Sequence, residues 1–341
     1  MILLFLFALG AIVGSFLNVC IYRLPRHESV SHPPSHCPNC NTRLRPLDLV
    51  PIVSQLALRS RCRYCGQKFS LRYAGIEALT GALFALAGTQ YVSFSQGFAA
   101  PFVGDPVQLA RDLVFMATLV VIFWVDFDTR LVQLESTLLL GLSAVALDAW
   151  RLYNDPMDVR GRVWTDGGVF ANLLPAPVPQ SLLAGVVAAT LLWVLRAVFG
   201  KIYGREAMGL GDVFIVAAIA MNLGWHSTLF TFFFLAAVLG AFIGTLFQIP
   251  RTVRAYKWAK RRAQRYDLPP FATAFARRSF RRSLMPFGPM LAIGAVAALL
   301  YGDQLNMAYL NYVTPPPAPG TTVLGAPPGA GASSSPGVGP F

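Results

Sequence analysis

The fold is set by the stretch Gly209-Leu210-Gly211-Asp212, which opens an apolar segment that runs from Val213 to Leu223. A carboxylate in such a segment is costly to bury and is usually functional, and glycine lets another part of the backbone approach closely. The comparable acid elsewhere is Asp126, at the end of the apolar residues 113–125. We therefore expect Asp126 and Asp212 to form a pair at the ends of two membrane helices.

The composition is that of a membrane protein. Hydrophobic residues make up 55% of the chain and charged residues 13%, as in chains built mostly from membrane spans. The net charge of +12 would suit nucleic acid in a soluble protein, but here the basic residues lie between apolar segments, where they fix orientation. The expected surroundings are therefore a lipid bilayer, and no nucleic-acid partner is expected.

Eight apolar segments are candidates to cross a bilayer core of about 30 Å at about 1.5 Å per helical residue. The first lacks a basic start and a small-residue cleavage site, so it is interpreted as a retained span rather than a signal peptide. The sequence predicts an all-α polytopic membrane protein with about eight transmembrane helices. The predicted spans are residues 1–22, 74–100, 109–125, 131–150, 180–199, 208–223, 227–249 and 286–301.

Two basic loops indicate the orientation. Residues 23–73 contain nine Lys or Arg, and residues 250–285 contain eleven, so both loops are expected in the cytoplasm. Both termini then lie outside, and both aspartates lie near the cytoplasmic face. The predicted division is a first span (1–22), a cytoplasmic loop (23–73), a transmembrane domain (74–302) and a tail (303–341) that is disordered and rich in Pro, Gly and Ser.

Four of the five cysteines lie in the first cytoplasmic loop, as the pairs Cys37-Pro38-Asn39-Cys40 and Cys62-Arg63-Tyr64-Cys65. Two such C-x-x-C pairs are typical of a tetrahedral zinc site. Disulfides are the alternative, but the cytoplasm is reducing and a loop of this size needs a structural staple. We expect structural zinc. Cys20, within the first span, is expected to be a buried apolar residue.

Two carboxylates in a low-dielectric site cannot both ionise easily, so they share one proton, and one can then act as general base while the other acts as general acid. Glu77 is a further intramembrane acid, interpreted either as functional or as a partner of Arg72. A transporter whose aspartates relay protons is an alternative function, although the two halves of the sequence do not correspond. A membrane-anchored zinc ribbon that binds a partner is another, but it leaves both aspartates unused.

The chain resembles the bacterial type IV prepilin peptidases, which are GxGD-type aspartic proteases, over most of its length to about Tyr301. In that family the aspartate of the GxGD motif works with one that opens a D-x-x-x-x-x-[IL]-P-D motif, and Asp126 occupies this place, with Asp128 as its neighbour. The pattern departs at its end, where Gln133-Leu134 replace Pro-Asp. The resemblance rests on Gly14-Ser15-Phe16-Leu17-Asn18-Val19, Tyr22-Arg23-Leu24-Pro25, the four cysteines, Arg72-Tyr73 with Glu77, Glu206-Ala207-Met208-Gly209-Leu210-Gly211-Asp212 and Pro286-Phe287-Gly288-Pro289.

The resemblance implies a bifunctional enzyme in the bacterial inner (cytoplasmic) membrane. Such an enzyme cleaves the leader from type IV prepilin or pseudopilin precursors after a glycine at the cytoplasmic membrane face. It then methylates the new N-terminal amine with S-adenosyl-L-methionine. No glycine-rich dinucleotide-type motif follows a strand here, so no residues are assigned to the methyl donor. The zinc loop is its expected neighbourhood.

Overall fold

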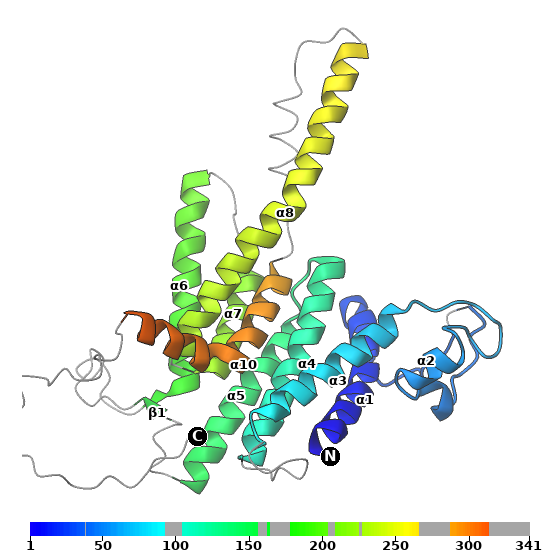
Figure 1. Cartoon of the computed structure of the whole chain (residues 1–341), viewed down its shortest axis with the longest axis horizontal. Coiled ribbons are helices and arrows are strands. Elements are labelled where there is room, and N and C mark those ends of the chain that lie inside the picture. Colours follow the sequence, from blue (N-terminus) through cyan, green and yellow to red (C-terminus); the bar gives the residue numbers. More distant parts are fainter. Residues whose placement is uncertain are drawn as a thin grey trace, which may run out of the picture.

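The computed structural model describes residues 1–37, 39–92, 104–155, 162–163, 178–203, 209–224, 227–265 and 287–313. These residues form a helical bundle (Figure 1). Its main helices are α1 (Ile2–Arg23), α3 (Arg72–Thr89), α4 (Pro106–Thr129), α5 (Leu134–Asn154), α6 (Gln180–Tyr203), α7 (Leu210–Leu223), α8 (Ser227–Arg265) and α10 (Gly288–Val313). Smaller elements are the 3₁₀ turns η1 (Leu24–Arg26) and η2 (Pro46–Leu49), the short helix α2 (Val53–Ala57), and the antiparallel pair β1 (Arg162–Val163) and β2 (Val178–Pro179).

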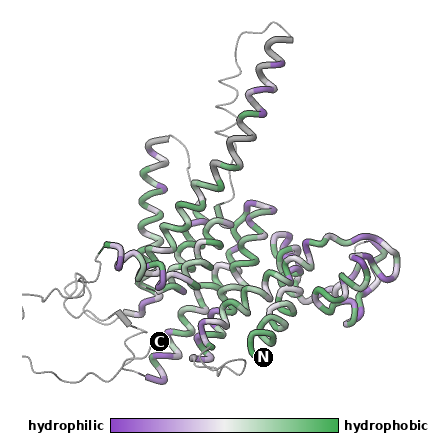
Figure 2. Tube along the Cα trace, in the orientation of Figure 1, coloured by the Kyte–Doolittle hydropathy of each residue, from purple (hydrophilic) through white to green (hydrophobic). Residues whose placement is uncertain are grey.

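Each predicted apolar segment coincides with one main helix, so the predicted all-α membrane fold is confirmed. Four helices, α1, α4, α6 and α10, are long and apolar enough to cross a membrane, while α7 and the first part of α8 are shorter apolar helices. Figure 2 shows hydrophobic residues along the bundle and hydrophilic residues in the segment between α1 and α3.

Three predicted boundaries are wrong. Helix α3 ends at Thr89, before the predicted limit at residue 100, and residues 93–100 lie outside the described residues. Helix α8 runs to Arg265, 16 residues beyond the predicted span, and extends past the rest of the bundle (Figure 1). Its residues after 250 are mostly Ala, Lys and Arg, which favour a helix. Helix α10 continues to Val313, so the tail predicted from residue 303 begins too early. Residues 314–341 lie outside the described residues.

The core of the bundle joins six helices around one apolar cluster. Helix α4 contributes Phe115 and Leu119, and α7 contributes Ile219, all at most 1% exposed. Side chains from α5, α6, α8 and α10 complete the cluster, among them Leu140, Ala188, Phe232 and Leu291. Helices α1 and α3 pack on one another and against α4 through a second cluster that includes Leu17, Ile76 and Val125. Helix α4 is therefore the shared element of the two halves.

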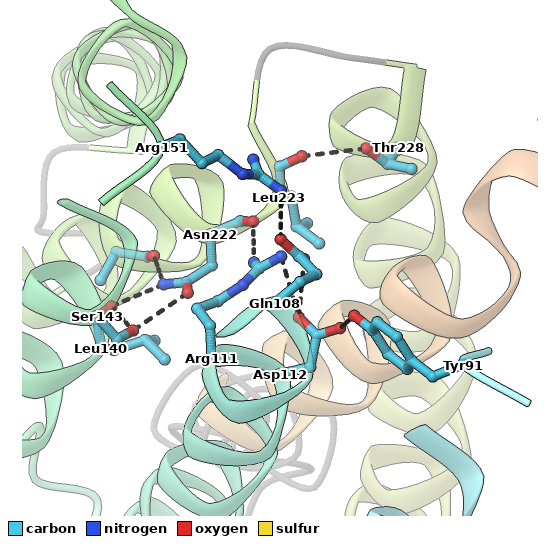
Figure 3. Close-up of polar contacts among 11 residues, drawn as sticks. Tyr91, Gln108, Arg111, Asp112, Leu140, Ser143, Arg151, Asn222, Leu223 and Thr228 are labelled. Atoms are coloured by element: carbon cyan, nitrogen blue, oxygen red, sulfur yellow. Dashed lines mark hydrogen bonds and ion pairs between the residues drawn. The ribbon is translucent and has the colours of Figure 1, made fainter. Parts of the chain in front are cut away.

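A polar network closes the end of the bundle where α4 begins and α7 ends (Figure 3). Arg111 donates a hydrogen bond to the carbonyl oxygen of Asn222 and forms an ion pair of 3.0 Å with Asp112. The Asn222 amide donates to the carbonyl oxygen of Leu140 at 2.7 Å. The Thr228 hydroxyl donates to the Leu223 carbonyl at 3.4 Å. The last carbonyl groups of a helix lack hydrogen-bond partners within it. At the end of α7, Arg111 and Thr228 donate the missing hydrogen bonds to two of these groups.

A cavity of about 300 Å³ lies beside this network. Its lining includes Arg111, Asp148, Arg151 and Asn222, so it is polar on several sides. Arg151 donates to the Gln108 side chain at 2.6 Å, which belongs to the same network. This end of the bundle is opposite the end where α4 finishes and α7 starts, which is where Asp126 and Asp212 lie.

Candidate active site

Asp126 lies near the end of α4 and is 5% exposed. The backbone N–H of Gly288, the first residue of α10, donates a hydrogen bond of 2.8 Å to its Oδ2. A Cβ atom added to Gly288 would lie 2.7 Å from the same oxygen and 3.0 Å from the Asp126 Cβ. Only glycine leaves room for this contact. The start of α10 therefore fixes the position of the Asp126 carboxyl group.

Asp212 is the third residue of α7, and the glycines before it have separate roles. Gly209 is the N-cap residue, and its N–H makes a hydrogen bond with the Asp212 carboxylate, as the third residue of a capping box does. A Cβ atom on Gly211 would lie 2.5 Å from the Cβ of Val132. The second glycine thus brings the start of α7 against the segment between α4 and α5.

The structure brings the two predicted aspartates to the same end of the bundle. Asp126 and Ile215, which lies one turn after Asp212, line the same small cavity, so the end of α4 and the start of α7 lie next to each other. Two glycine contacts bring these helices together. Gly288 lets the start of α10 contact Asp126, and Gly211 lets the start of α7 contact Val132, in the segment that follows α4. Residues 206–208 and 286 of the motifs lie outside the described residues.

Asp128 is in a different environment from Asp126, although it lies only two residues away. Arg72 of α3 donates to both of its carboxylate oxygens, at 3.0 and 2.5 Å. The same guanidinium lies over the Trp124 ring, 4.4 Å from its centroid, in a cation–π contact. Asp128 therefore has a fixed cationic partner at the surface, which supports the choice of Asp126 for the pair.

Glu77 does not pair with Arg72, so that part of the prediction is wrong. Its Oε2 accepts a hydrogen bond of 2.7 Å from the backbone N–H of Ile52, and the Ser15 hydroxyl is a second partner. Ile52 has φ = 61°, an unusual backbone conformation for a β-branched residue. The buried carboxyl group thus holds the segment that precedes α2 against α1 and α3. Tertiary packing decides the partner of Glu77, because it brings Arg72 to Asp128 instead.

The four loop cysteines converge as predicted. Their sulfur atoms all lie within 4.8 Å of one another, and together they could hold a metal ion. Each pair sits in a similar turn: the Cys37 N–H donates to the Thr42 carbonyl oxygen at 3.0 Å, and the Cys62 N–H donates to that of Gln67 at 2.8 Å. All four are free thiols, as is the buried Cys20. The cluster is therefore a candidate metal centre, and no disulfide joins these four cysteines in the structure.

Two of the four cysteines lie in surroundings that favour the thiolate, which is the form that binds metal. Hydrogen bonds from Thr42 lower the pKa of the Cys40 thiol to about 6. Backbone N–H groups of Cys65 and Tyr64 lower the pKa of the Cys62 thiol. The loop is also held by Asp48, which forms an ion pair of 2.7 Å with Arg63. The folded loop therefore contains both a cysteine cluster of the kind that binds a metal ion and a separate ion pair.

Comparisons with known proteins match both halves of the chain. The model of the bacterial peptidase A24 N-terminal domain matches residues 8–91, and that of the type IV leader peptidase family matches residues 113–245. A prepilin leader peptidase/N-methyltransferase of Dickeya chrysanthemi is 34% identical over 250 residues, which cover 66% of this chain and 76% of that protein. This chain belongs to the type IV leader peptidase family.

Other relatives of this leader peptidase carry the same name. The Aeromonas hydrophila protein is 29% identical over 335 residues, 91% of this chain and 93% of its own length. The Myxococcus xanthus protein is 33% identical over 242 residues, which are 71% of this chain and 62% of that protein. None of the solved structures matches the chain.

Two further residues lie at the candidate active site, although the sequence did not predict their contacts there. Gly288 belongs to a motif that identified the family, but its contact with Asp126 joins positions 162 residues apart. Gln133, noted only as a departure from the family pattern, lines a small cavity together with Asp126. The sequence signal for Gln133 was its departure from the family pattern that begins at Asp126. That signal did not predict the conformation of the Gln133 side chain.

Proposed function

We propose that this leader peptidase cleaves prepilin-like precursors with Asp126 and Asp212 as its two catalytic acids. The observation that carries the assignment is the convergence of both carboxyl groups at one end of the bundle, with Asp126 buried and held by the Gly288 N–H. Acidic residues within membrane helices are costly and rare, and they usually mark functional sites.

The chemistry follows from a shared proton. Two neighbouring carboxyl groups in a low-dielectric site hold one proton between them. The ionised group takes a proton from water as the oxygen attacks the scissile carbonyl carbon, and the protonated group gives its proton to the leaving amide nitrogen. No covalent intermediate with the enzyme is needed. The pair titrates as a unit.

The four cysteines are proposed to bind structural zinc. In a tetrahedral site with Zn–S bonds of about 2.3 Å, neighbouring sulfur atoms lie about 3.8 Å apart. The Cys37 and Cys65 sulfur atoms are 3.8 Å apart, so the donor set fits the metal. Zinc would supply a fixed crosslink between the two turns, and the four thiolates of this chain would hold it. In a loop of this size, metal binding contributes directly to folding.

The proposed substrates are type IV prepilins or pseudopilins, whose basic leader meets the enzyme at the cytoplasmic face of the inner membrane. Methylation of the new N-terminal amine by S-adenosylmethionine is proposed for the neighbourhood of the zinc loop. That loop exposes apolar side chains, including Leu47, Val53 and Leu56, which give a ligand apolar surface to cover. The methyl donor supplies an electrophilic methyl group when bound.

A cleavage assay tests the proposal. The purified protein in detergent or liposomes is incubated with a model prepilin, and the new N-terminus and the mass of the product are measured. We expect cleavage after the leader glycine and, with S-adenosylmethionine present, a mass increase of one methyl group. A product cut elsewhere, or an intact precursor, would refute the proposed peptidase activity.

A further inference from the structure

A cavity of about 10 Å³ lies beside Asp126, which is about the room that one water molecule needs. Ile215 reaches it from α7, one turn after Asp212. Its polar lining residues are Asp126 and Gln133, and the others are aliphatic: Ile122, Val125, Leu131, Val132 and Ile215. An aliphatic wall with two polar groups favours one oriented water over a larger solvent cluster.

Gln133 is held firmly, yet one end of its side chain has no partner. It is the N-cap residue of α5, and its carbonyl oxygen accepts hydrogen bonds from the Thr137 N–H at 3.2 Å and the Thr137 hydroxyl at 2.9 Å. Its Oε1 accepts from the Ser136 hydroxyl at 3.4 Å. Its Nε2 is buried without a hydrogen-bond partner among the described residues. Such a buried donor is costly and requires an explanation.

Asp126 has a complementary arrangement. Its Oδ2 is occupied by the Gly288 N–H at 2.8 Å, whereas no described residue donates a hydrogen bond to its Oδ1. Asp126 and Gln133 both line the cavity; one has an acceptor that no described residue uses, and the other has an unpaired donor. The family pattern has proline in place of Gln133. Proline has no N–H donor, so the amide donor at this position is a feature of this chain.

We propose that one water molecule binds between Oδ1 of Asp126 and Nε2 of Gln133, and that this water is the nucleophile in leader cleavage. The proposal rests on the peptidase function proposed above and makes Gln133 a further catalytic residue. The water donates one hydrogen to Oδ1, and the amide donates into one of its lone pairs. The other lone pair remains free to attack the scissile carbonyl carbon.

The step is balanced. As the new C–O bond forms, the proton of the water passes to Asp126. The C–N bond then breaks, and protonated Asp212 transfers its proton to the leaving nitrogen. Asp126 is assigned the role of base because Asp126, and not Asp212, is among the residues that line the cavity. The Gln133 amide keeps its protons throughout and acts by orienting the water.

Gln133→Met tests the proposal, because methionine has a similar length and shape but no donor. We expect kcat for prepilin cleavage to fall about 100-fold, the effect of a misplaced reactant, with KM within about twofold of the wild-type value. Methylation of a pre-cleaved pilin peptide should be unchanged. Thermal stability should stay close to that of the wild type, since methionine fills a similar volume and the backbone carbonyl of residue 133 still accepts both hydrogen bonds from Thr137.

Gln90→Met is the matched control. The Gln90 amide donates to the Leu300 carbonyl oxygen at 3.1 Å, at the opposite end of α3 from Arg72 and away from the cavity, so its loss should leave kcat within about twofold. Ser136→Ala should lower kcat by less than Gln133→Met, because it removes only the hydrogen bond that orients the amide.

Two results would overturn the water site alone: a Gln133→Met variant that cleaves as fast as an active wild type, or one whose melting temperature falls together with its kcat. The second result would show that Gln133 serves the start of α5. A wild-type protein that fails to cleave any prepilin would instead refute the proposed function, and the water site with it.

Discussion

The backbone N–H of Gly288 donates a hydrogen bond to Oδ2 of Asp126 across 162 residues of sequence. A helix N-terminus has free N–H groups, and here one of them is used to position a buried acid. The contact depends on the missing side chain, since any Cβ at position 288 would overlap the carboxyl group. It gives the family's Pro-Phe-Gly-Pro motif a physical role in this chain.

Gly288→Ala should lower the kcat of cleavage about 100-fold, because the added methyl group displaces Asp126 or α10 by a large fraction of an ångström. Cleavage kinetics in detergent measure the effect. Gly75→Ala is the matched control: it lies in α3, where an added Cβ meets no atom within 4 Å, and alanine favours a helix. Equal activity of the two variants would contradict the proposed role of the Gly288 contact.

Asp126→Asn and Asp212→Asn should each lower cleavage by at least about 1,000-fold, the scale of lost acid–base catalysis. Asparagine keeps the shape of the side chain but cannot exchange the proton. Expression, membrane insertion and methylation of a pre-cleaved peptide should persist in both variants. Substantial cleavage by either one would remove that residue from the catalytic pair.

Asp128→Asn should cleave within about threefold of wild type, because half-exposed ion pairs contribute only about 0.2–1 kcal/mol and Asp128 is bound to Arg72. Parallel assays of the Asp126 and Asp128 variants measure this directly. If Asp128→Asn is inactive and Asp126→Asn is active, the two acids have been assigned in the wrong order.

Glu77→Gln should behave like wild type, since the amide oxygen of glutamine can still accept the Ile52 N–H. Glu77→Leu should lose that acceptor and loosen the segment around α2, at a cost of about 1–3 kcal/mol. Faster hydrogen exchange of residues 46–58 in the leucine variant alone would show this. Loss of cleavage in both variants would instead indicate that the acid itself takes part in catalysis.

Replacing Cys37 and Cys40 together by Ser should release the metal, disorder the loop and abolish methylation, with at most reduced cleavage. Metal binding supplies folding free energy of order 10 kcal/mol in small zinc peptides, whereas the aspartates are held by helices of the bundle. Metal content by mass spectrometry and separate assays of the two activities test each part. Cys20→Ala, outside the cluster, should retain the metal.

Wild-type protein without zinc after purification in the absence of chelators would overturn the structural-metal proposal. Methylation that survives in the double cysteine variant would separate the loop from the transferase activity. These outcomes are independent, because the first concerns the metal and the second concerns the location of methyl transfer.

The helices and the cysteine cluster were predictable because their signals are local. An apolar run of sufficient length predicts a membrane helix, and two C-x-x-C pairs predict a shared site. The approach of α7 to Val132 was partly predictable, since the glycine at position 211 indicated a close contact without naming its partner.

Side-chain contacts that depend on tertiary packing were not predictable. Arg72 had two acids within reach, and only the relative placement of α3 and α4 decides for Asp128 over Glu77. The end of α8 was missed for another reason: the prediction followed apolar residues, while the helix continues through basic residues that are good helix formers. The unpaired amide of Gln133 depends on a rotamer that no sequence pattern specifies.

The polar cavity at the far end of α7 affects how a transmembrane voltage acts on the protein. Voltage falls across the low-dielectric layer between two aqueous phases. Ten residues, or roughly 15 Å of helix, separate Asn222 at the cavity from Asp212, compared with about 30 Å for a bilayer core. If solvent fills the cavity of about 300 Å³, the electric field along α7 is about twice that in the surrounding lipid. Proton exchange at the two carboxyl groups would then be sensitive to the voltage across the membrane.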